Sequence, residues 1–550
     1  MSNELNNGRK LIDGRWVRWD EERAQRAYTR GLWSRATLAD ALREAARQTP
    51  DRVLLVDGDY RLECRTLYEQ ATAVAHSMLS RAPAGSVVSF ILPNWHEAAV
   101  LYLAATLAGM VVNPILPSMR DRELQFILQD ARTRLIFVPA MIRQQDYAAM
   151  MSRVASRIEN PPVVVVLRGE PAGHTSWDAF IKTAGRRHEM PTPDADAVRM
   201  VLYTSGTTGR AKGVLHSHNS INALIHQLRE HWLIERGDKF LVPSPIAHIG
   251  GSIYAFECPL LLGTTAVLME RWDADEAVRL MNAESCTHMA GATPFLEQLL
   301  AAARRAETRL PHLKVFICGG ASVPPSLIRT ATAYFERAVV TRVYGSTEVP
   351  VTTVGVTQKD DAAHAADTDG RAGLAEIKLV GRDNVPAEEG EILARAPQML
   401  VGYLHAQDEA DAFDADGFFR TGDLARRVDG AYIVVTGRAK DIIIRNGENI
   451  SPKEIEDILI GHPDIAEIAI VGLPDPRTGE RACAVIVPKT LPGPVVASLN
   501  TYLDAQGVAR FKIPEQVVIW EALPKNDAGK ILKHQIRATL AAQEHHAHID

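Results

Sequence analysis

The chain has 550 residues, enough for several domains, and its 61 basic and 67 acidic residues give a net charge of −6. Hydrophobic residues make up 46% and charged residues 23% of the sequence, an ordinary globular composition that excludes a disordered, fibrous or coiled-coil protein. Because there is no basic excess, neither nucleic acid nor an anionic membrane surface is expected as a partner.

Five cysteines are dispersed along the chain without CxxC or CxxH pairs. An odd, scattered set favours a reducing compartment and argues against a disulfide framework or a structural zinc site. The first eight residues are polar and lack the apolar segment of a secretory signal. We therefore expect a cytoplasmic protein.

Helical and strand-like patterns alternate in the first part of the chain. Thr37 and Asp40 resemble a capping box and predict an amphipathic helix over 38–48, followed by a strand-like run over 53–56. The apolar stretch 98–112 falls short of the roughly 20 residues that cross a bilayer. It predicts a buried helix that leads through Gly109 into a buried strand, and no integral membrane span.

The same rhythm continues through short apolar runs at 87–92, 134–138 and 163–167. Strands that alternate with helices predict parallel sheets covered by helices. The fold class is therefore expected to be α/β, with βα layers in a large N-terminal domain.

The pattern changes near residue 370, where short strands and tight turns replace the βα rhythm. Asp429-Gly430 lies between two apolar runs, which is a hairpin signal. These strands predict a small β-barrel-like subdomain, and beyond Gly437 a smaller α+β domain follows. We place the N-terminal domain at 1–437 and the C-terminal domain at 438–550. The expected C-terminal elements are helices over 452–460 and 496–506 and strands over 465–471, 482–487 and 516–519.

The most informative segment runs from Tyr203 to Val214 and reads Tyr-Thr-Ser-Gly-Thr-Thr-Gly-Arg-Ala-Lys-Gly-Val. Its glycines and hydroxyls allow successive backbone N–H groups to surround phosphate oxygens, and Lys212 adds positive charge. A P-loop NTPase needs Gly-x4-Gly-Lys-Ser/Thr. Here Ala211 stands five places after Gly206 and Gly213 follows Lys212. The segment predicts a phosphate-binding loop of another kind.

Residues 204–213 resemble the phosphate loop of the adenylate-forming superfamily, which includes acyl-CoA synthetases, luciferases and peptide-synthetase adenylation domains. Five further motifs of that superfamily recur in the same order, so the resemblance covers nearly the whole chain. They are Cys318-Gly-Gly-Ala-Ser-Val-Pro324, Tyr344-Gly-Ser-Thr-Glu348, Thr421-Gly-Asp423, Gly437-Arg-Ala-Lys-Asp441 and Pro524-Lys-Asn-Asp-Ala-Gly-Lys530. Six motifs in order identify the chain as a member of the superfamily.

The resemblance implies a role for each matching residue. It implies that Tyr344 stacks on adenine, that Thr347 contacts the α-phosphate, that Glu348 helps to hold Mg²⁺ and that Asp423 binds both ribose hydroxyls. Lys530, Glu348 and Thr204 are the expected catalytic residues, and Lys440 is the expected hinge of a mobile C-terminal domain. The expected ATP site comprises Thr204, Ser205, Gly206, Thr207, Thr208, Gly209, Lys212, Gly320, Ala321, Ser322, Tyr344, Thr347, Asp423 and Arg438.

Several of these residues also have a chemical rationale of their own, together with an ordinary alternative. Glu348 offers a hard oxygen ligand suited to magnesium, or it is a surface carboxylate after a turn. Asp423 can accept two hydroxyl hydrogen bonds, or it caps a helix. Arg438 meets ribose or phosphate, or it is a solvated loop charge. Tyr344 is equally compatible with an ordinary core position.

The acyl site is expected around Pro245-Ile-Ala-His-Ile-Gly-Gly251. By the resemblance, His248 gates the acyl pocket and the tunnel for the pantetheine arm; the alternative is a hydrogen-bonded core histidine. The small residues Ala290, Gly291 and Ala292 would leave room for an apolar substrate. Gly447 would line the CoA tunnel once the C-terminal domain rotates, because glycine lets a thioester arm pass close to the backbone; a plain turn glycine is the alternative.

The sequence departs from the superfamily pattern at three places. Ala211 replaces the common proline of the phosphate loop, and Asn526 and Ala528 replace the common threonine and serine before Lys530. The lost hydroxyls put the closing kinetics of the lysine loop in doubt more than its existence.

The resemblance implies an AMP-forming acid–thiol ligase: acid and ATP give acyl-AMP and pyrophosphate, and acyl-AMP and coenzyme A then give acyl-CoA and AMP. Mg²⁺ with ATP is the expected cofactor, and coenzyme A is the co-substrate. The segments around His288, Cys318 and Tyr344 look most like short- and medium-chain fatty acyl-CoA synthetases and cyclohexanecarboxylate-CoA ligases. One alternative is a ligase that loads an aryl or fatty acid onto a carrier protein; another is a nucleotide-binding sensor with a dead site. A homodimer is left open.

Overall fold

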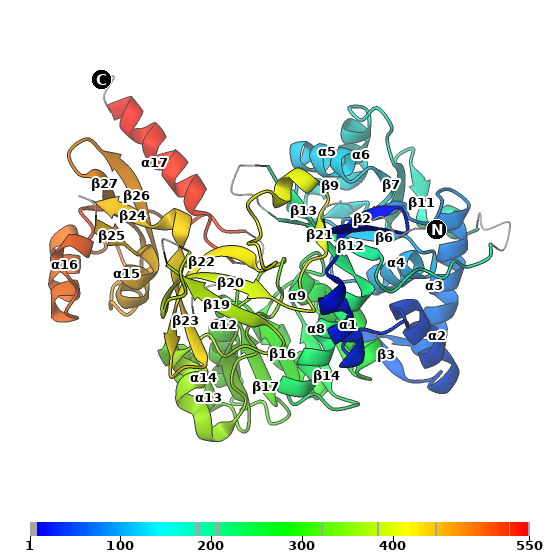
Figure 1. Ribbon diagram of the computed structural model, residues 1–550, viewed down its shortest axis with the longest axis horizontal. Helices are drawn as coiled ribbons and strands as arrows, with labels where there is room; N and C mark the ends of the chain where they lie inside the picture. Colours follow the sequence, from blue (N-terminus) through cyan, green and yellow to red (C-terminus); the bar gives the residue numbers. More distant parts are fainter. Residues whose placement is uncertain are drawn as a thin grey trace.

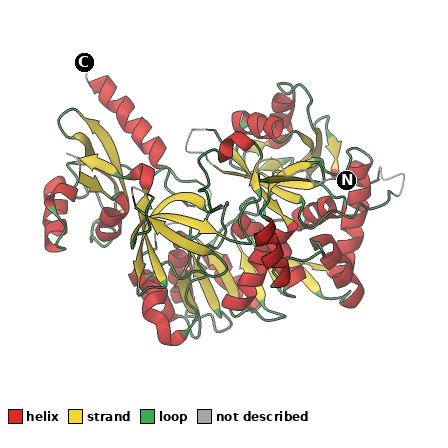
Figure 2. Ribbon diagram, in the orientation of Figure 1, coloured by secondary structure: helices red, strands yellow, loops and turns green. Residues whose placement is uncertain are grey.

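The computed structural model describes residues 8–182, 188–204, 210–320, 323–381, 384–445, 448–526 and 529–547. Figure 1 shows a large N-terminal part with several sheets and a smaller C-terminal unit at one end of the molecule. Figure 2 shows helices packed around the sheets of the large part. The predicted α/β fold with a smaller C-terminal domain is confirmed, while the boundary at 437 and the mobility of the C-terminal domain stay predictions.

The first large sheet has eight strands in the order β11-β10-β7-β5-β6-β12-β13-β21. The strands from β11 to β12 are parallel, and β13 and β21 add an antiparallel edge. The strands are β5 (Val87–Phe90), β6 (Val111–Pro114), β7 (Thr133–Pro139), β10 (Val163–Leu167), β11 (Thr175–Ser176), β12 (Val198–Thr204), β13 (Lys212–Ser217) and β21 (Gly402–Tyr403). Helices of this part are α3 (Cys64–Leu79), α4 (His96–Leu107), α5 (Asp121–Asp130), α6 (Tyr147–Ala155), α7 (Trp177–Lys182) and α8 (His218–His231).

The second large sheet has seven strands in the order β18-β17-β16-β14-β15-β3-β4 and is parallel except for β4. The strands are β3 (Val53–Asp57), β4 (Tyr60–Glu63), β14 (Lys239–Val242), β15 (Thr265–Leu268), β16 (His288–Gly291), β17 (Val315–Cys318) and β18 (Val339–Arg342). Its helices are α2 (Leu38–Gln48), α9 (Ile249–Ser252), the π-helix η1 (Ile253–Glu257), α10 (Cys258–Leu261), α11 (Ala274–Ala283), α12 (Thr293–Arg305), α13 (Pro325–Tyr334) and α14 (Ala362–Asp367).

An antiparallel sheet of four strands follows in the chain, in the order β19-β20-β22-β23. Its strands are β19 (Glu376–Val380), β20 (Glu389–Arg395), β22 (Phe419–Val428) and β23 (Tyr432–Arg438). Asp429 and Gly430 form the tight turn between β22 and β23 with φ angles of 46° and 73°. The predicted hairpin is confirmed. This sheet is the third main sheet of the large part.

The C-terminal unit is built on a five-stranded sheet around β27. Its strands are β24 (Ile443–Arg445), β25 (Glu448–Ile450), β26 (Ile465–Asp475), β27 (Gly479–Pro488) and β28 (Gln516–Ile519), and its helices are α15 (Pro452–Leu459), α16 (Val496–Ala505) and α17 (Lys533–Ala547). Short elements elsewhere are β1 (Arg9–Ile12), β2 (Arg15–Arg18), α1 (Glu21–Thr29), β8 (Met141–Ile142), β9 (Gln145–Asp146), η2 (Lys359–Asp361), η3 (Ala406–Glu409), η4 (Ala439–Asp441) and η5 (Arg510–Lys512).

Local sequence signals explain two of the predicted elements. The Thr37 hydroxyl accepts the Asp40 N–H at 3.4 Å and Asp40 Oδ2 accepts the Thr37 N–H at 2.8 Å, so the capping box begins α2. The apolar stretch 98–112 forms most of α4 and the start of β6, and both are buried. In the part of the chain that the structure describes, no helix is long and apolar enough to cross a membrane. All five cysteines are buried thiols outside any disulfide.

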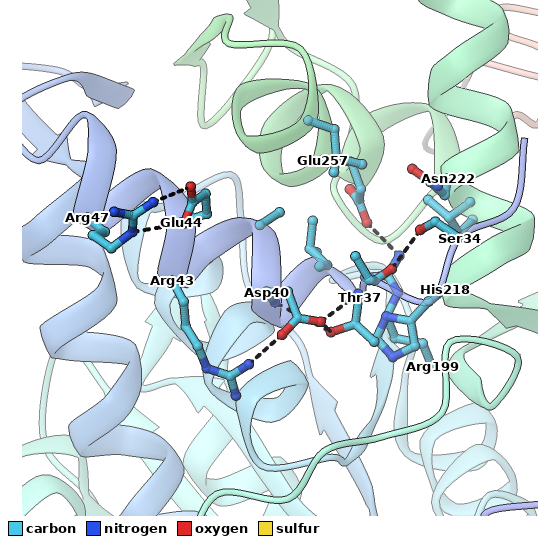
Figure 3. Close-up of a pocket in the computed structure, with 15 residues that line it drawn as sticks. Ser34, Thr37, Asp40, Arg43, Glu44, Arg47, Arg199, His218, Asn222 and Glu257 are labelled. Carbon is cyan, nitrogen blue, oxygen red and sulfur yellow. Dashed lines mark hydrogen bonds and ion pairs between the residues drawn. The ribbon is translucent and has the colours of Figure 1, made fainter. Parts of the chain in front are cut away.

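A buried polar triad joins the two large sheets. Arg199 of β12 pairs with Glu257 of η1 at 2.7 Å and donates to the Tyr102 hydroxyl at 2.8 Å, and that hydroxyl donates to Glu257. The Arg199 and Glu257 side chains are 2% and 1% exposed. Figure 3 shows both beside α2, on the wall of a cavity of about 560 Å³. The triad therefore fixes η1 against β12 deep in the large part.

We expect Arg199→Met to destabilise the protein strongly. The substitution leaves the Glu257 carboxylate buried without its cation, which typically costs about 3–5 kcal/mol. Thermal unfolding of the full chain measures the effect. Arg305→Met is the matched control because its partner Asp275 and Arg305 itself are both exposed. Equal, small shifts of the unfolding temperature in the two variants would contradict the structural role of the triad.

Candidate functional site

The Asp423 carboxylate lies at the centre of the site. The β22–β23 hairpin places it directly opposite Arg438, and Arg438 Nε lies 2.8 Å from Asp423 Oδ1. The Tyr344 hydroxyl donates to Asp423 Oδ2 at 2.7 Å. The residue is only 5% exposed, so the two partners compensate a nearly buried charge. The structure thus brings together three residues of the predicted ATP site.

Tyr344 is held in place by its own backbone. Its N–H donates to the Thr353 hydroxyl at 2.8 Å, and the Thr353 N–H donates to the Tyr344 carbonyl at 3.0 Å. A Cβ at the next residue, Gly345, would lie 2.6 Å from the Val351 nitrogen, so only glycine fits there. Burial and the Asp423 carboxylate raise the pKa of Tyr344. The phenol therefore stays protonated and remains a donor.

Lys530 of the C-terminal unit faces this cluster from a tight turn. The Asn526 side-chain oxygen accepts the Lys530 N–H at 2.8 Å, and the Asn526 N–H donates to the Lys530 carbonyl at 2.9 Å. Gly529 has a φ of +77°, which favours glycine. Asn526 thus supports the loop although the common threonine is missing; Ala528 lies outside the described residues. Figure 1 shows the segment that precedes α17 beside β22.

Lys530 lies among two cations, Arg438 and Lys440, and two carboxylates, Asp423 and Asp441. Loss of hydration and the neighbouring Arg438 lower the pKa of Lys530 to about 8; Lys440 also lowers it, and Asp423 opposes the shift. The side chain is still open to solvent at its surface. Arg438 ends β23, directly after the predicted boundary at 437, whereas Lys530 lies just before α17 in the C-terminal unit. Such a cluster of cations favours a polyanionic ligand such as a nucleotide.

The flanks of the predicted phosphate loop lie on two paired strands. Thr204 ends β12, Lys212 begins β13, and the two are partners in the antiparallel register. Lys212 Nζ lies 3.4 Å from the Asp408 carbonyl and 5.2 Å from the centre of the Tyr403 ring. Thr204 and Lys212 are therefore neighbours at one edge of the site. The loop itself, Ser205, Gly206, Thr207, Thr208 and Gly209, lies outside the described residues.

Glu348 and Thr347 are fixed by residues that the sequence analysis did not identify. The Tyr403 hydroxyl donates to Glu348 Oε1 at 3.1 Å, and His216 Nε2 donates to the Thr347 carbonyl at 2.8 Å. Burial lowers the pKa of His216 to about 4, so the ring is neutral and its tautomer is set by this bond. No motif signalled Tyr403 or His216; the only sequence signal for His216 was its position two residues after Val214 in the strand that follows the phosphate loop.

The chemistry of Glu348 fits the expected magnesium ion. Mg²⁺ prefers hard oxygen ligands and is usually held by one or two carboxylates together with substrate phosphates and water. Glu348 is half-buried, near the strand that carries Lys212, and supplies such a carboxylate. One carboxylate from the protein is sufficient for an ion whose other ligands are water and the phosphates of the nucleotide.

The predicted acyl-site residues meet where two neighbouring strands end. His248 follows β14 and begins α9 half-buried, while Ala290 and Gly291 end β16, the parallel neighbour of β14. Asn94 holds the intervening loop: its amide donates to the Val242 and Ser244 carbonyls at 3.0 and 2.9 Å. A Cβ on Gly291 would lie 2.4 Å from the Phe295 ring, so Gly291 admits that ring. Ala292 caps the start of α12.

The remaining predicted residues fall into two groups. Gly320 is exposed with a φ of +82°, and Lys440 lies exposed in η4, between β23 and β24. Ala321, Ser322 and Gly447 lie outside the described residues, so their predicted contacts with ATP and CoA stay predictions.

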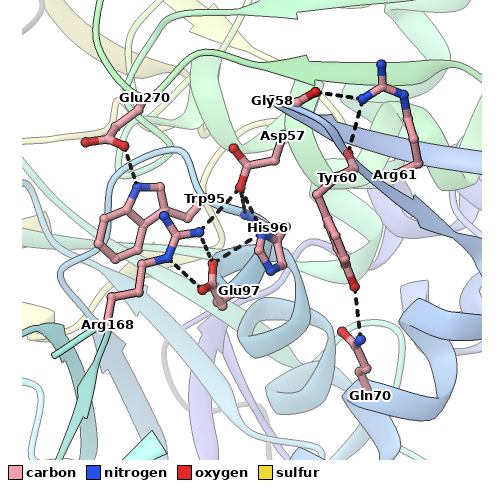
Figure 4. Close-up of polar contacts among 10 residues, drawn as sticks. All are labelled: Asp57, Gly58, Tyr60, Arg61, Gln70, Trp95, His96, Glu97, Arg168 and Glu270. Atoms are coloured by element: carbon pink, nitrogen blue, oxygen red, sulfur yellow. Dashed lines mark hydrogen bonds and ion pairs between the residues drawn. The ribbon is translucent and has the colours of Figure 1, made fainter.

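A second polar cluster does not fit a metal centre. Asp57, His96 and Glu97 bring possible ligand atoms within 4.8 Å of one another. Arg168 already pairs with Glu97 at 2.7 Å and with Asp57 at 3.5 Å, and its guanidinium stacks over Trp95 (Figure 4). The cation that compensates these carboxylates is thus an arginine. We interpret the cluster as a set of structural ion pairs rather than a metal site.

Comparison with known proteins identifies the family and several relatives of this chain. Residues 42–404 match the AMP-binding enzyme family, and residues 454–530 match the AMP-binding enzyme C-terminal domain. The chain is 34% identical over 530 residues to a medium-chain fatty-acid–CoA ligase of Escherichia coli (strain K12), covering 94% of this chain and 93% of the relative. It is 32% identical over 547 residues to a salicyl-AMP ligase / salicyl-S-ArCP synthetase of Mycobacterium tuberculosis (strain ATCC 25618 / H37Rv), covering 95% and 94%. The solved structure of ATP-bound MatB from Rhodopseudomonas palustris is similar with a TM-score of 0.81 and 26% identity, covering 91% of this chain and 98% of that one.

We expect the Lys530 amine to lose its proton near pH 8 in the free protein, well below the usual value of about 10.4. Below that pH the ammonium form dominates, and above it the neutral amine becomes reactive. Pulse labelling with an amine-reactive reagent at a series of pH values, followed by mass spectrometry of the Lys530 peptide, gives the midpoint. Arg438→Met should move the midpoint upward. A wild-type midpoint near 10.4, or no upward shift in the variant, would contradict the described surroundings.

Proposed function

Because this chain belongs to the AMP-binding enzyme family and is an enzyme of the AMP-forming acyl-CoA ligase type, we propose that it activates an apolar carboxylic acid with ATP and transfers the acyl group to coenzyme A. The acid is a short- or medium-chain fatty acid or an alicyclic acid. The observation that carries the proposal is the meeting of Lys530 with Arg438 and Asp423 between the two parts of the chain. A ligase that joins two anions needs such a cluster of positive charge.

The chemical difficulty of the first step is repulsion, because a carboxylate oxygen must attack the negatively charged α-phosphate of ATP. In our proposal the ribose hydroxyls bind Asp423, whose pairing with Arg438 and Tyr344 orients the carboxylate beforehand. Lys530 reaches the acid and the α-phosphate together and stabilises the charge of the transition state. Thr204, Thr347 and Lys212 contact the phosphates. When Mg²⁺ is bound through Glu348, it neutralises further phosphate charge.

The second step requires a different set of groups at the same place. We propose that the C-terminal domain, 438–550, rotates about Lys440 after pyrophosphate leaves. Lys530 would then withdraw, and Gly447 would line the path of the pantetheine thiol to the acyl carbonyl. Lys440 lies in η4, the short connection between the sheet that carries Asp423 and the C-terminal sheet, which is a suitable place for a hinge.

The identity of the acid is proposed from the small residues at the end of β16. Ala290 and Ala292 would leave room for an apolar body beside the Phe295 ring, which packs on Gly291, with His248 as the gate. A relative named medium-chain fatty-acid–CoA ligase is 34% identical to this chain, which supports an apolar acid. The alternative is delivery to a carrier protein, and the relative named salicyl-S-ArCP synthetase supports it at 32% identity.

The proposal is tested by product analysis with ATP, Mg²⁺, coenzyme A and a panel of linear, alicyclic and aromatic acids. We expect AMP and pyrophosphate, and an acyl-CoA formed best from a medium-chain or alicyclic acid. Chelation of Mg²⁺ should abolish pyrophosphate release. Formation of ADP and orthophosphate would refute the proposal. Pyrophosphate release without consumption of coenzyme A would favour the carrier-protein alternative.

Lys530→Ala should separate the two half-reactions. Loss of a donor that stabilises the transition state typically slows a step by about 10²–10³-fold, so pyrophosphate release with the acid should fall by this factor. Thioester formation from supplied acyl-AMP should continue, because the rotated domain carries Lys530 away. Lys489→Ala, which removes an exposed lysine of the same domain, serves as the control. Equal loss in both steps would assign Lys530 a structural role instead.

A further inference from the structure

Two cations at the start of β13 share one carboxylate. Arg210 Nη2 donates to both carboxylate oxygens of Asp408 at 2.8 Å. Lys212 Nζ lies 3.4 Å from the Asp408 carbonyl and 4.0 Å from Asp408 Oδ1. The Asp408 side chain is only 10% exposed, so these two cations compensate a charge that is largely withdrawn from water. Asp408 therefore holds the chain where it leaves the predicted phosphate loop.

The segment that carries Asp408 is itself anchored. Asp408 lies in the short helix η3. The next residue, Glu409, accepts the Tyr403 N–H at 2.9 Å and pairs with Arg18 of β2 at 3.2 Å. Strand β21, which contains Tyr403, is paired with β13 in the first large sheet. The carboxylate is thus presented by a segment that is fixed against the strand whose cations it meets.

A second carboxylate holds the other end of the loop. The hydroxyl of Tyr203, in β12, donates at 2.8 Å to Oδ2 of Asp130, the last residue of α5. His405 Nε2 lies 2.7 Å from Asp130 Oδ1. Arg210 Nη1 lies 3.8 Å from the same oxygen, so its guanidinium reaches Asp130 as well as Asp408. Because Tyr203 precedes the loop and Arg210 directly follows it, both ends belong to one network of ion pairs and hydrogen bonds.

We propose that Asp408 is a positioning residue of the ATP site: it fixes the exit of the phosphate loop through Arg210 and holds the Lys212 ammonium in place. Lys212 Nζ lies 5.2 Å from the centre of the Tyr403 ring, and the Tyr403 hydroxyl donates to Glu348 Oε1 at 3.1 Å. The ammonium is thereby kept near the carboxylate proposed to bind Mg²⁺. This inference rests on the proposed function, because the phosphates of ATP are the ligand that Lys212 would meet there.

The two half-reactions depend on this network to different degrees. A site that is competent for only part of the time binds its ligand more weakly, in proportion to the competent fraction. Loss of the Asp408 charge should therefore raise the ATP concentration that the first step requires, whereas saturating ATP should restore its rate. The second step should not change, because acyl-AMP lacks two of the three phosphates of ATP.

Asp408→Asn tests the role in the full-length enzyme, because asparagine keeps the size of the side chain and one acceptor oxygen but removes the charge. The KM for ATP in pyrophosphate release should rise by about two- to fivefold, as expected for a partly exposed ion pair. The kcat, the KM for the acid and thioester formation from supplied acyl-AMP should stay unchanged. Arg210→Gln should raise the KM for ATP in the same way. In the double variant the rise should be smaller than the product of the two single effects, because the two side chains act through one contact.

Asp411→Asn is the matched control, since it removes the same charge at an exposed position just after η3 and should leave the KM for ATP unchanged. The positioning role is refuted if Asp408→Asn leaves this KM unchanged, if both half-reactions slow equally, or if the two single effects multiply in the double variant. Failure of the proposed function looks different: the wild-type enzyme itself would then form no AMP and pyrophosphate with any acid of the panel.

Discussion

The site depends on one nearly buried carboxylate and on the hairpin that presents it. Asp423 is only 5% exposed, and Arg438 and Tyr344 compensate its burial with an ion pair and a hydrogen bond. Arg438 lies opposite it because the register of β22 and β23 shifts by one residue between Leu424 and Ala425; the pairing that begins at the Asp429-Gly430 turn would otherwise place Gly437 opposite Asp423. A slip of one residue would turn the carboxylate to the opposite face of the sheet. The position of a nucleotide-binding group is thus decided by the turn together with the register shift in the middle of the hairpin.

The C-terminal unit adds to this carboxylate more positive charge than it can neutralise. Arg438, Lys440 and Lys530 converge on Asp423 and Asp441, and the pKa of Lys530 is lowered to about 8 as a consequence of lost hydration and this repulsion. Repulsion between Lys530 and Arg438 at the end of β23 opposes closure of the lysine loop on the hairpin, whereas a bound anion between them would attract both. Phosphate binding and closure of the lysine loop are therefore coupled by electrostatics.

The sequence allowed those features to be predicted that depend on neighbouring residues. The capping box of Thr37 and Asp40, the buried stretch 98–112 and the Asp429-Gly430 hairpin are all local patterns, and the structure contains each of them. The meeting of Asp423 with Lys530 followed from resemblance, not from spacing. Tyr403, His216 and Asp408 were missed because their roles depend on contacts between distant segments, such as β21 added to the edge of β13. No periodicity or motif encodes such a contact.

The departures from the superfamily pattern show which properties of the site are replaceable. Asn526 lacks the usual hydroxyl, yet its amide oxygen accepts the Lys530 N–H and retains the turn. Ala211 lacks the restricted φ of proline, but the preceding Arg210 forms two hydrogen bonds with the Asp408 carboxylate, both at 2.8 Å, and anchors the exit of the phosphate loop. In both places another interaction constrains the backbone, whereas the groups proposed to reach the substrates are those of the superfamily. The backbone of a loop can be held by different kinds of hydrogen bond, but the negative charge of the α-phosphate can be stabilised in this way only by a positively charged side chain.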